Sequence, residues 1–390
     1  PAGGIPDMGE VELLNEDYIL QSVDGANLSY VDAEEGYFKL YESFLEKGGR
    51  ALLETTAHSL IYDDDGNISG VTAISDDGTT YTVYAKAVVL ATGGFGGNEE
   101  MVEKYTPGGS AWIYYGWQNN DGDGINMAFD AGAAPMHMDA YPMSHQRMGA
   151  EFITCFDVQQ TNDGQIWSPN DLTVVLSVNQ DGVYLTKDGK PFRTEDIRSK
   201  MGGFSGSMGS YYLGSTYYAV YSATQLRLYE SQGISDTTMG FQNVGEGIPD
   251  NTPLGDWVDT VLEYAASRGW AWKVNSLSEG NYVLNLPEGT LEAAYAADAT
   301  SLNAIGDEYY YIIEGTGLSI SSCGGILVNE KMQAVRNDES VLENLFIAGN
   351  DSFGNIMATG AEYSIGGDAG MWCFGSGYIA GIEAVNVAKG

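Results

Sequence analysis

The chain has 390 residues, of which 43% are hydrophobic and 12% aromatic, a composition typical of a folded protein with enough material for two domains. Its 17 Lys and Arg residues stand against 54 Asp and Glu residues, so the formal net charge is −37 at pH 7. Such a negative field repels nucleic acids and anionic membrane surfaces, and no apolar run reaches the roughly 18 residues of a membrane-spanning helix. We therefore expect no nucleic-acid partner and no membrane insertion.

The first predicted element in chain order is a helix. It starts near Asp32 and Glu35, which have the spacing of a capping box, and it stops at Gly48 and Gly49. A series of strands joined by hairpin turns follows over residues 50–92. A helix, a small meander and a buried strand in this order indicate an α/β domain.

The rest of the chain differs in composition and in its predicted elements. A second helix is predicted at 121–133, another at 256–269, and a last one, rich in small residues, near the C-terminus. Residues 141–322 hold most of the tryptophans and a Gly/Ser/Tyr-rich passage, which predicts an inserted second domain. The sequence begins at Pro1 without a basic or apolar leader, so a cytoplasmic and an exported location both stay open.

Potential metal ligands are sparse. The three cysteines lie far apart without a C-x-x-C pair, and the chain has three histidines, so we expect no metal site and no Ser-His-Asp hydrolase. The stretch NNDGDGINMAFD, 119–130, is close to an EF-hand loop. However, the residues before it do not form an amphipathic helix and Asp130 replaces the usual Glu, so a turn that starts a helix is the favoured interpretation.

Two apolar segments end in glycine. The first is AKAVVLATGGFGGN, 85–98, and the second is LFIAG, 345–349. Strands that are apolar on both faces are typical of parallel α/β sheets, where ligands lie beyond the carboxyl ends of the strands. Glycines there let the backbone approach a ligand and leave its N–H groups free to donate. The pair predicts that two strand ends converge on one flat ligand with a polar edge.

Five segments in order over nearly the whole chain resemble the fumarate reductase/3-ketosteroid dehydrogenase family of FAD-dependent oxidoreductases. They are AKAVVLATGGFGGN, GDGINMAFDAGA, YYYIIEGTGLSISSCGGILVN, LFIAGNDSFG and SIGGDAGMWCFGSGYIAG. The resemblance implies an α/β fold, α+β overall. In it, a split FAD-binding domain of the glutathione-reductase-like type, 1–140 and 323–390, carries an inserted α+β capping domain, 141–322.

The resemblance also implies FAD as the cofactor and places a set of residues beside it. These residues are Ala91, Thr92, Gly93, Gly94, Gly349, Asn350, Asp351, Ser364, Ile365 and Gly366. The G-x-G-x-x-G turn that opens the family has no match before Ala85, and the formal match at 375–380 lies ten residues from the end with no βαβ unit after it. Either the sequence is a fragment, or the chain binds flavin poorly or not at all.

The resemblance implies a reaction that reduces or forms a C=C bond next to an electron-withdrawing group. Fumarate reductases have a proton-donating arginine at a position where one alignment places Tyr184 and a second places Pro191. In another segment, Ile320 and Ser321 stand where those enzymes have histidines. Because these replacements remove the groups that hold carboxylates, we expect an apolar or aromatic unsaturated substrate rather than fumarate. An unidentified electron donor is the second expected partner.

Tyrosine can act as an acid when its surroundings lower its pKa. The predicted catalytic residues are Tyr184, Tyr363, Tyr141 and Arg193, and the predicted substrate contacts are Ser321, Ser322, His145 and Arg147. Alternatives stay open: tyrosines that only pack, a salt bridge from Arg193 to Glu195 or Asp196, and a solvated loop around His145 and Arg147. A second hypothesis for the whole chain is a truncated or decayed relative that binds a ligand or partner without redox activity.

Overall fold

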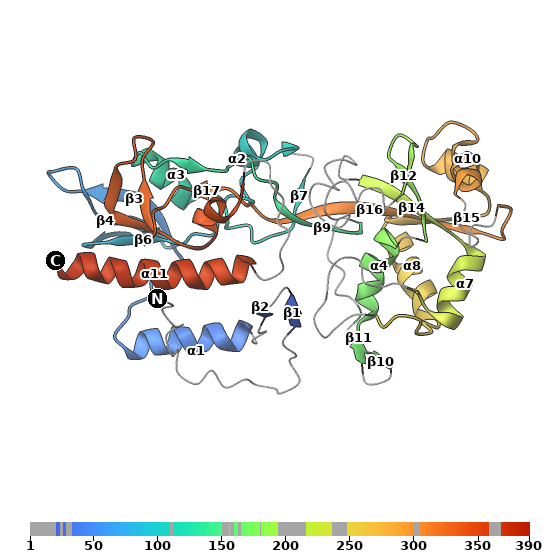
Figure 1. Ribbon diagram of the computed structural model, residues 1–390, viewed down its shortest axis with the longest axis horizontal. Helices are drawn as coiled ribbons and strands as arrows, with labels where there is room; N and C mark the ends of the chain where they lie inside the picture. Colours follow the sequence, from blue (N-terminus) through green and yellow to red (C-terminus); the bar gives the residue numbers. More distant parts are fainter. Residues whose placement is uncertain are drawn as a thin grey trace.

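The computed structural model describes residues 21–23, 26–28, 33–109, 112–149, 156, 160–162, 165–179, 181–193, 216–235, 248–298, 305–358 and 368–390. The described elements form two lobes, which are joined by the long strand β16 (Tyr310–Ser321) and by β9 (Met143–Met148) (Figure 1). Helices and sheets are mixed in both lobes. Among the described residues, no helix combines the length and the apolar character that crossing a bilayer would require.

The first lobe contains the N- and C-terminal elements. Its helices are α1 (Ala33–Glu46), α2 (Glu99–Tyr105), α3 (Asp123–Asp130) and α11 (Asp368–Lys389). Its strands are β3 (Thr55–Tyr62), β4 (Ile68–Ser75), β5 (Thr80–Tyr84), β6 (Val88–Leu90), β8 (Pro135–Met136), β17 (Gly325–Ile326), β18 (Gln333–Val335) and β19 (Val341–Ile347). A 3₁₀ run, η3 (Gly349–Ile356), follows β19, and a hairpin, β1 (Gln21–Val23) and β2 (Ala26–Leu28), precedes α1.

The sheet β18–β19–β6 positions the strand ends that the sequence singles out. Leu345 and Ile347 face a core that includes Ile125 of α3, while Phe346 faces Ala380 of α11 on the other side. Figure 1 shows α11 running along this sheet. The apolar run of β19 therefore reflects burial on both faces.

The second lobe is built on an antiparallel sheet in the order β13–β12–β14–β16–β15, and β7 and β9 also pair with β16. The strands not yet located are β7 (Ile113–Tyr114), β12 (Val183–Thr186), β13 (Pro191–Phe192), β14 (Thr216–Ser222) and β15 (Ala271–Val274). The helices are α4 (Leu172–Val178), α7 (Ala223–Gln232), α8 (Trp257–Ser267), α9 (Leu277–Val283) and α10 (Thr290–Ala297). A hairpin, β10 (Gln160–Asn162) and β11 (Gln165–Trp167), and the 3₁₀ turn η2 (Pro169–Asp171) precede α4.

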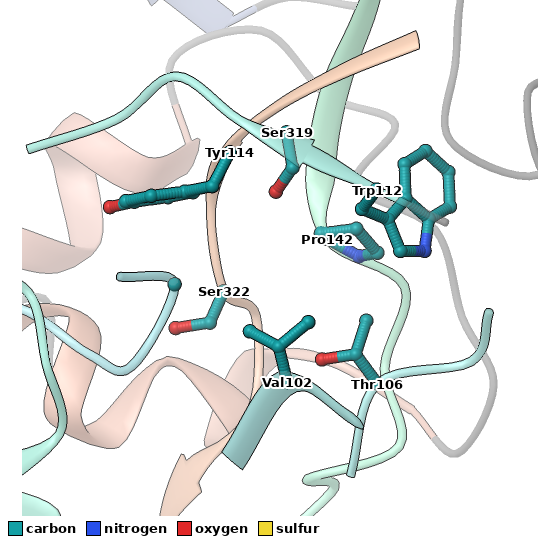
Figure 2. A pocket seen from close by; sticks show the side chains of 8 residues that line it. Val102, Thr106, Trp112, Tyr114, Pro142, Ser319 and Ser322 are labelled. Atoms are coloured by element: carbon teal, nitrogen blue, oxygen red, sulfur yellow. The ribbon is translucent and has the colours of Figure 1, made fainter. Parts of the chain in front are cut away.

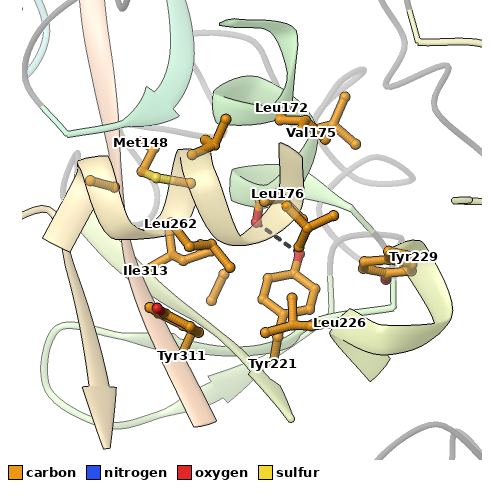
Figure 3. Close-up of a cluster of buried hydrophobic side chains, with 14 of the residues drawn as sticks. Met148, Leu172, Val175, Leu176, Tyr221, Leu226, Tyr229, Leu262, Tyr311 and Ile313 are labelled. Carbon is orange, nitrogen blue, oxygen red and sulfur yellow. Dashed lines mark hydrogen bonds between the residues drawn. The ribbon is translucent and has the colours of Figure 1, made fainter. Parts of the chain in front are cut away.

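Helices cover both faces of this sheet. Tyr311 and Ile313 of β16 pack with α4, α7 and α8 (Figure 3), while Tyr310 and Ile312 pack with α9 and α10 on the opposite face. Alternate residues of a strand point to opposite faces, so β16 has to be apolar at every one of these positions. Tyr221 extends this packing, because its hydroxyl donates to the backbone oxygen of Leu176 at 2.8 Å.

The helices predicted from the sequence are confirmed at α1, α3, α8 and α11. Residues 119–122 form a turn from which α3 starts, and β7 rather than a helix precedes that turn, so the EF-hand comparison fails. Within the described residues, no group of three or more His, Cys, Asp or Glu side chains has a metal-binding arrangement. The domain boundaries at 140 and 322 stay a prediction.

Candidate cofactor site at the ends of β6 and β19

The two glycine-terminated strands lie side by side. β6 and β19 pair in parallel with Val88 opposite Leu345 and Leu90 opposite Ile347, and the amide of Ala348 donates to the oxygen of Leu90 at 2.9 Å. Parallel strands in register bring their carboxyl ends to the same edge of the sheet. The predicted convergence of the two strand ends is confirmed.

The turn after β6 depends on glycine. Gly93 and Gly94 have φ values of 101° and 93°, in the region that L residues with a side chain avoid. A Cβ at Gly94 would lie 2.6 Å from the Oγ of Ser322, and one at Gly93 would collide with the side chain of Asn120. Backbone conformation and close packing both require glycine at these two positions.

Asp351 binds this turn from the other strand end. Its carboxylate accepts hydrogen bonds from the amide of Thr92 at 2.5 Å, from the Thr92 hydroxyl at 2.9 Å and from the amide of Gly94 at 2.9 Å. Burial raises the pKa of the Asp351 carboxyl, and the hydrogen bonds from Thr92 and Gly94 oppose that rise. The expectation that the turn leaves its N–H groups free for a ligand is therefore wrong for Thr92 and Gly94, because a buried carboxylate of the same chain accepts from both.

Ser321 and Ser322 continue the network from the end of β16. The Ser322 hydroxyl accepts from the amide of Phe95 at 2.9 Å, and the side-chain amide of Asn350 donates to the Ser321 hydroxyl at 2.5 Å. Gly349, with φ of 63°, donates its amide to the hydroxyl of Ser376 in α11 at 2.9 Å. Four segments, the turn after β6, the end of β16, residues 349–350 and α11, are thus held at one edge of the sheet.

The predicted cofactor residues differ in their exposure. Ala91 and Thr92 are exposed, Gly93, Gly349 and Asn350 are half-buried, and Gly94 and Asp351 are buried. The exposed and half-buried members are uncharged and small or of moderate size, which fits a flat group lying against bare backbone. Ser364, Ile365 and Gly366, together with Tyr363, lie outside the described residues.

The formal G-x-G-x-x-G match lies inside α11, at residues 375–380. The backbone amides in the interior of a helix are used by its own hydrogen bonds, so this segment does not form a phosphate-binding turn. This outcome confirms the interpretation made from its position in the sequence.

The predicted substrate contacts His145 and Arg147 belong to β9. Their backbones stand opposite Leu318 and Thr316 of β16, so this segment is a strand and not the loop that the alternative predicted. The segment MSHQRM is polar, but antiparallel pairing with a long buried strand gives it β-structure. Ser321, which pairs with Met143 of β9, ends the same strand, and Ser322 follows it.

Tyr141 and Arg193 occupy different lobes. Tyr141 is half-buried and precedes Pro142, which lines a small cavity next to the glycine turn. Arg193 is exposed at the end of β13. The backbone of Tyr141 therefore lies one residue from the cavity lining, whereas Arg193 lies at the end of a strand of the second lobe.

The small cavity lies between the glycine turn and β16 (Figure 2). Its lining consists of Gly96, Val102, Thr106, Trp112, Tyr114, Pro142, Ser319 and Ser322. Sequence reasoning did not single out Tyr114, whose hydroxyl donates to the oxygen of Trp117 at 3.0 Å, or Asn120, which packs on Gly93. Burial raises the pKa of Tyr114. The sequence feature that could have identified Tyr114 and Asn120 is their position shortly before the GDG turn from which α3 starts.

Tyr184 lies in the core of the second lobe and is 2% exposed. Its hydroxyl donates to the backbone oxygen of Asn179 at 2.6 Å, and its ring packs on Phe192 and Tyr217. Burial, followed by the charges of Tyr221 and Tyr217, raises the pKa of Tyr184 well above its usual value, which makes it a weaker acid. These observations favour a packing role for Tyr184 over the predicted catalytic one.

We expect a Tyr184→Phe variant to lose about 0.5–1.5 kcal/mol of unfolding free energy, because the Asn179 oxygen keeps a second donor, the amide of Gly182 at 3.2 Å. Urea unfolding followed by circular dichroism measures this loss. Tyr282→Phe, at a side chain that is 87% exposed, is the control and should change stability by less than about 0.5 kcal/mol. A stability change for Tyr184→Phe no larger than that of the control would argue against the packing role.

Comparison with known proteins agrees with the resemblance seen in the sequence. Residues 26–148 match the family model described as an FAD binding domain. The chain is 24% identical over 359 residues to the fumarate reductase (cytochrome) of Shewanella frigidimarina, and this match covers 90% of the chain and 54% of the relative. It is 25% identical over 363 residues to the NADH:acrylate oxidoreductase of Vibrio harveyi, covering 89% of the chain and 31% of the relative. The chain thus spans about half or less of the length of these relatives.

The fold is similar to that of a solved enzyme. The 3-ketosteroid-Δ4-(5α)-dehydrogenase of Rhodococcus jostii RHA1 superposes with a TM-score of 0.54 at 19% identity, over 90% of this chain and 62% of that one. At this identity the likeness shows the fold alone. The chain therefore carries an FAD-binding domain, which indicates FAD as its cofactor. It is homologous to the flavoprotein of fumarate reductases and structurally similar to 3-ketosteroid dehydrogenases.

Proposed function

We propose that the chain forms part of an oxidoreductase that reduces or forms a C=C bond next to an electron-withdrawing group, with an apolar or aromatic substrate rather than fumarate. The observation that carries this proposal is the edge where β6 and β19 end, whose exposed and half-buried residues are uncharged, while the carboxylate there, that of Asp351, is buried. This edge supports a flat, mostly uncharged ligand better than a dicarboxylate.

On this proposal the chain has the split architecture expected from its resemblance, with residues 1–140 and 323–390 around the cofactor and 141–322 as a cap. The connection supports it, since β16 leads from the core of the second lobe to Ser321 and Ser322 at the turn. A strand that reaches the turn can place residues of the second lobe next to a bound ligand.

When bound, FAD supplies hydride exchange with one carbon of the double bond. The protein has to hold the substrate and handle a proton at the other carbon. Tyr141 fits this role best among the described candidates, because it is half-buried and is the chain neighbour of Pro142, which lines the cavity next to the turn. By their position in the sequence, Tyr363 stays a candidate for the proton and His145 and Arg147 stay candidates for substrate contact, whereas Arg193 lies in the second lobe at the end of β13.

The uncharged positions support the choice of substrate. Ile320 and Ser321, where the resemblance places histidines, are half-buried, and the Ser321 hydroxyl is bonded to Asn350. Tyr115, next along the chain from the cavity-lining Tyr114, is 43% exposed and donates its amide to the oxygen of Ser319 at 2.7 Å. Holding two carboxylates calls for cationic donors, and these residues supply none.

The proposal is tested in two steps. First, purified protein is mixed with FAD, and bound flavin is quantified after denaturation; we expect near-stoichiometric binding. Second, the flavin is reduced anaerobically with dithionite, and its reoxidation is followed with a cyclic enone, with cinnamate and with fumarate. We expect the enone or cinnamate to reoxidise it faster than fumarate does, with free reduced FAD as the control.

Two outcomes would contradict the proposal. Preferential reoxidation by fumarate would overturn the substrate class. Well-folded protein that binds no FAD would favour the alternative of a relative without redox activity, for which the occupied amides of Thr92 and Gly94 are the supporting observation.

A further inference from the structure

The turn at residues 92–94 has the geometry of a backbone anion-binding nest. Consecutive amides in a turn with left-handed residues point into one concavity and attract negative charge. Here Gly93 and Gly94 have positive φ, and the amides of Thr92 and Gly94 point to the same carboxylate, that of Asp351. The Thr92 hydroxyl adds a third donor.

Asp351 occupies this nest completely. The residue is 0% exposed, and both of its carboxylate oxygens accept hydrogen bonds from the turn. Burying a carboxylate is costly unless several donors satisfy it, and bonds from amides to an ionised acceptor are the strong kind. Asp351 also follows β19 while Thr92 follows β6, so the contact fastens the two strand ends to each other.

We propose that Asp351 is a positioning residue: its carboxylate serves as the built-in anion of the 92–94 turn, fixes that turn for the cofactor, and closes it to phosphate or carboxylate groups of a ligand. Bound FAD then meets neutral backbone at this turn rather than a site for one of its phosphates. The inference rests on the proposed function only where it concerns FAD. The occupied nest can be tested without any cofactor.

The test uses chemical rescue by formate, which is the carboxylate group of Asp351 without its side chain. In Asp351→Ala the amides of Thr92 and Gly94 lose their acceptor and open a small anion site. We expect the melting temperature of this variant to fall by about 5 °C or more, since several charge-assisted hydrogen bonds are lost. Sodium formate should restore part of this loss in a concentration-dependent way, whereas formamide, a neutral analogue of similar size, should not.

A matched control separates this effect from a general effect of salt. Asp338 is exposed and accepts from the amide and the hydroxyl of Ser340 at 3.1 and 2.6 Å, so Asp338→Ala also removes an aspartate that accepts from a backbone amide and a hydroxyl. Formate should shift the melting temperatures of the wild type and of Asp338→Ala equally, and should raise that of Asp351→Ala by more. Equal shifts in all three proteins would overturn the occupied nest.

FAD affinity is the second readout. We expect Asp351→Ala to bind FAD at least roughly tenfold more weakly than the wild type and to recover with formate. Wild-type affinity in a variant whose stability formate rescues would overturn the positioning role and leave the nest in place. If the wild type itself binds no FAD, the proposed function fails, and rescue by formate alone decides on the nest.

A second variant covers failure of Asp351→Ala to fold. Asp351→Asn keeps the size of the side chain but replaces one acceptor oxygen by an NH₂ group that opposes the turn amides. We expect it to be less stable than the wild type and insensitive to formate, because the amide group still fills the nest. Stability equal to that of the wild type would show that the charge of Asp351 is not needed and would overturn the proposal.

Discussion

A Gly94→Ala variant is expected to unfold with a free energy about 2–5 kcal/mol below that of the wild type. An L residue at a φ of 93° costs about 1–2 kcal/mol, and the added methyl would lie 2.6 Å from the Ser322 hydroxyl and push it from the Phe95 amide, which adds about 1–3 kcal/mol. Urea unfolding followed by circular dichroism measures the loss.

The matched control for this variant is Gly78→Ala. Gly78 has a φ of 84° in the β4–β5 hairpin, and a Cβ there would meet nothing within 4 Å. The two substitutions share the backbone strain, so their difference reports the contact with Ser322. Equal losses in the two variants would show that the close approach of the turn to Ser322 contributes no stability.

An Ile313→Ala variant is expected to lose about 2–5 kcal/mol of unfolding free energy, the range for removing a fully buried aliphatic side chain. Ile313 is 0% exposed, stands between Ala219 of β14 and Ala271 of β15, and packs in the core of Figure 3. Tryptophan fluorescence during urea unfolding is a suitable probe, because Trp270 precedes β15, Trp272 belongs to it, and both pack in the same lobe.

Ile305→Ala provides the comparison, since Ile305 is 58% exposed and lies shortly before the same strand. It should change stability by less than about 0.5 kcal/mol. A loss for Ile313→Ala below about 1 kcal/mol would mean that the core around β16 closes over the cavity, and that the packing of this strand is not a main source of stability.

The sequence was sufficient for the parts of the site that depend on local pattern. Apolar residues followed by glycine at 88–94 and 345–349 predicted two buried strands with converging ends, and the structure pairs them in register. Helical spacing likewise placed α1 and α3. These features follow from residues that are neighbours in the chain, where periodicity and turn chemistry act directly.

The contacts between distant segments could not be predicted in this way. The carboxylate of Asp351 reaches the amide of Thr92 across 259 residues of sequence, and nothing around either residue announces the contact. The burial of Tyr184 could not be predicted for the same reason, because the sequence around a strand tyrosine is the same whether the side chain contacts a ligand or a hydrophobic core. Its neighbours Tyr217 and Tyr221 come from β14, which only the folded sheet brings beside β12.

β16 has a mechanical consequence for the molecule. As a single strand of 12 residues it is about 40 Å long, at about 3.3 Å per residue, and pairing along its length makes it stiff. Its N-terminal half is buried in the core of the second lobe, and its other end leads to the hydroxyls of Ser321 and Ser322, which bond to Asn350 and to the amide of Phe95. It can therefore act as a lever: a tilt of about 10° around its Ser321 end would displace the far end by roughly 7 Å, given that length.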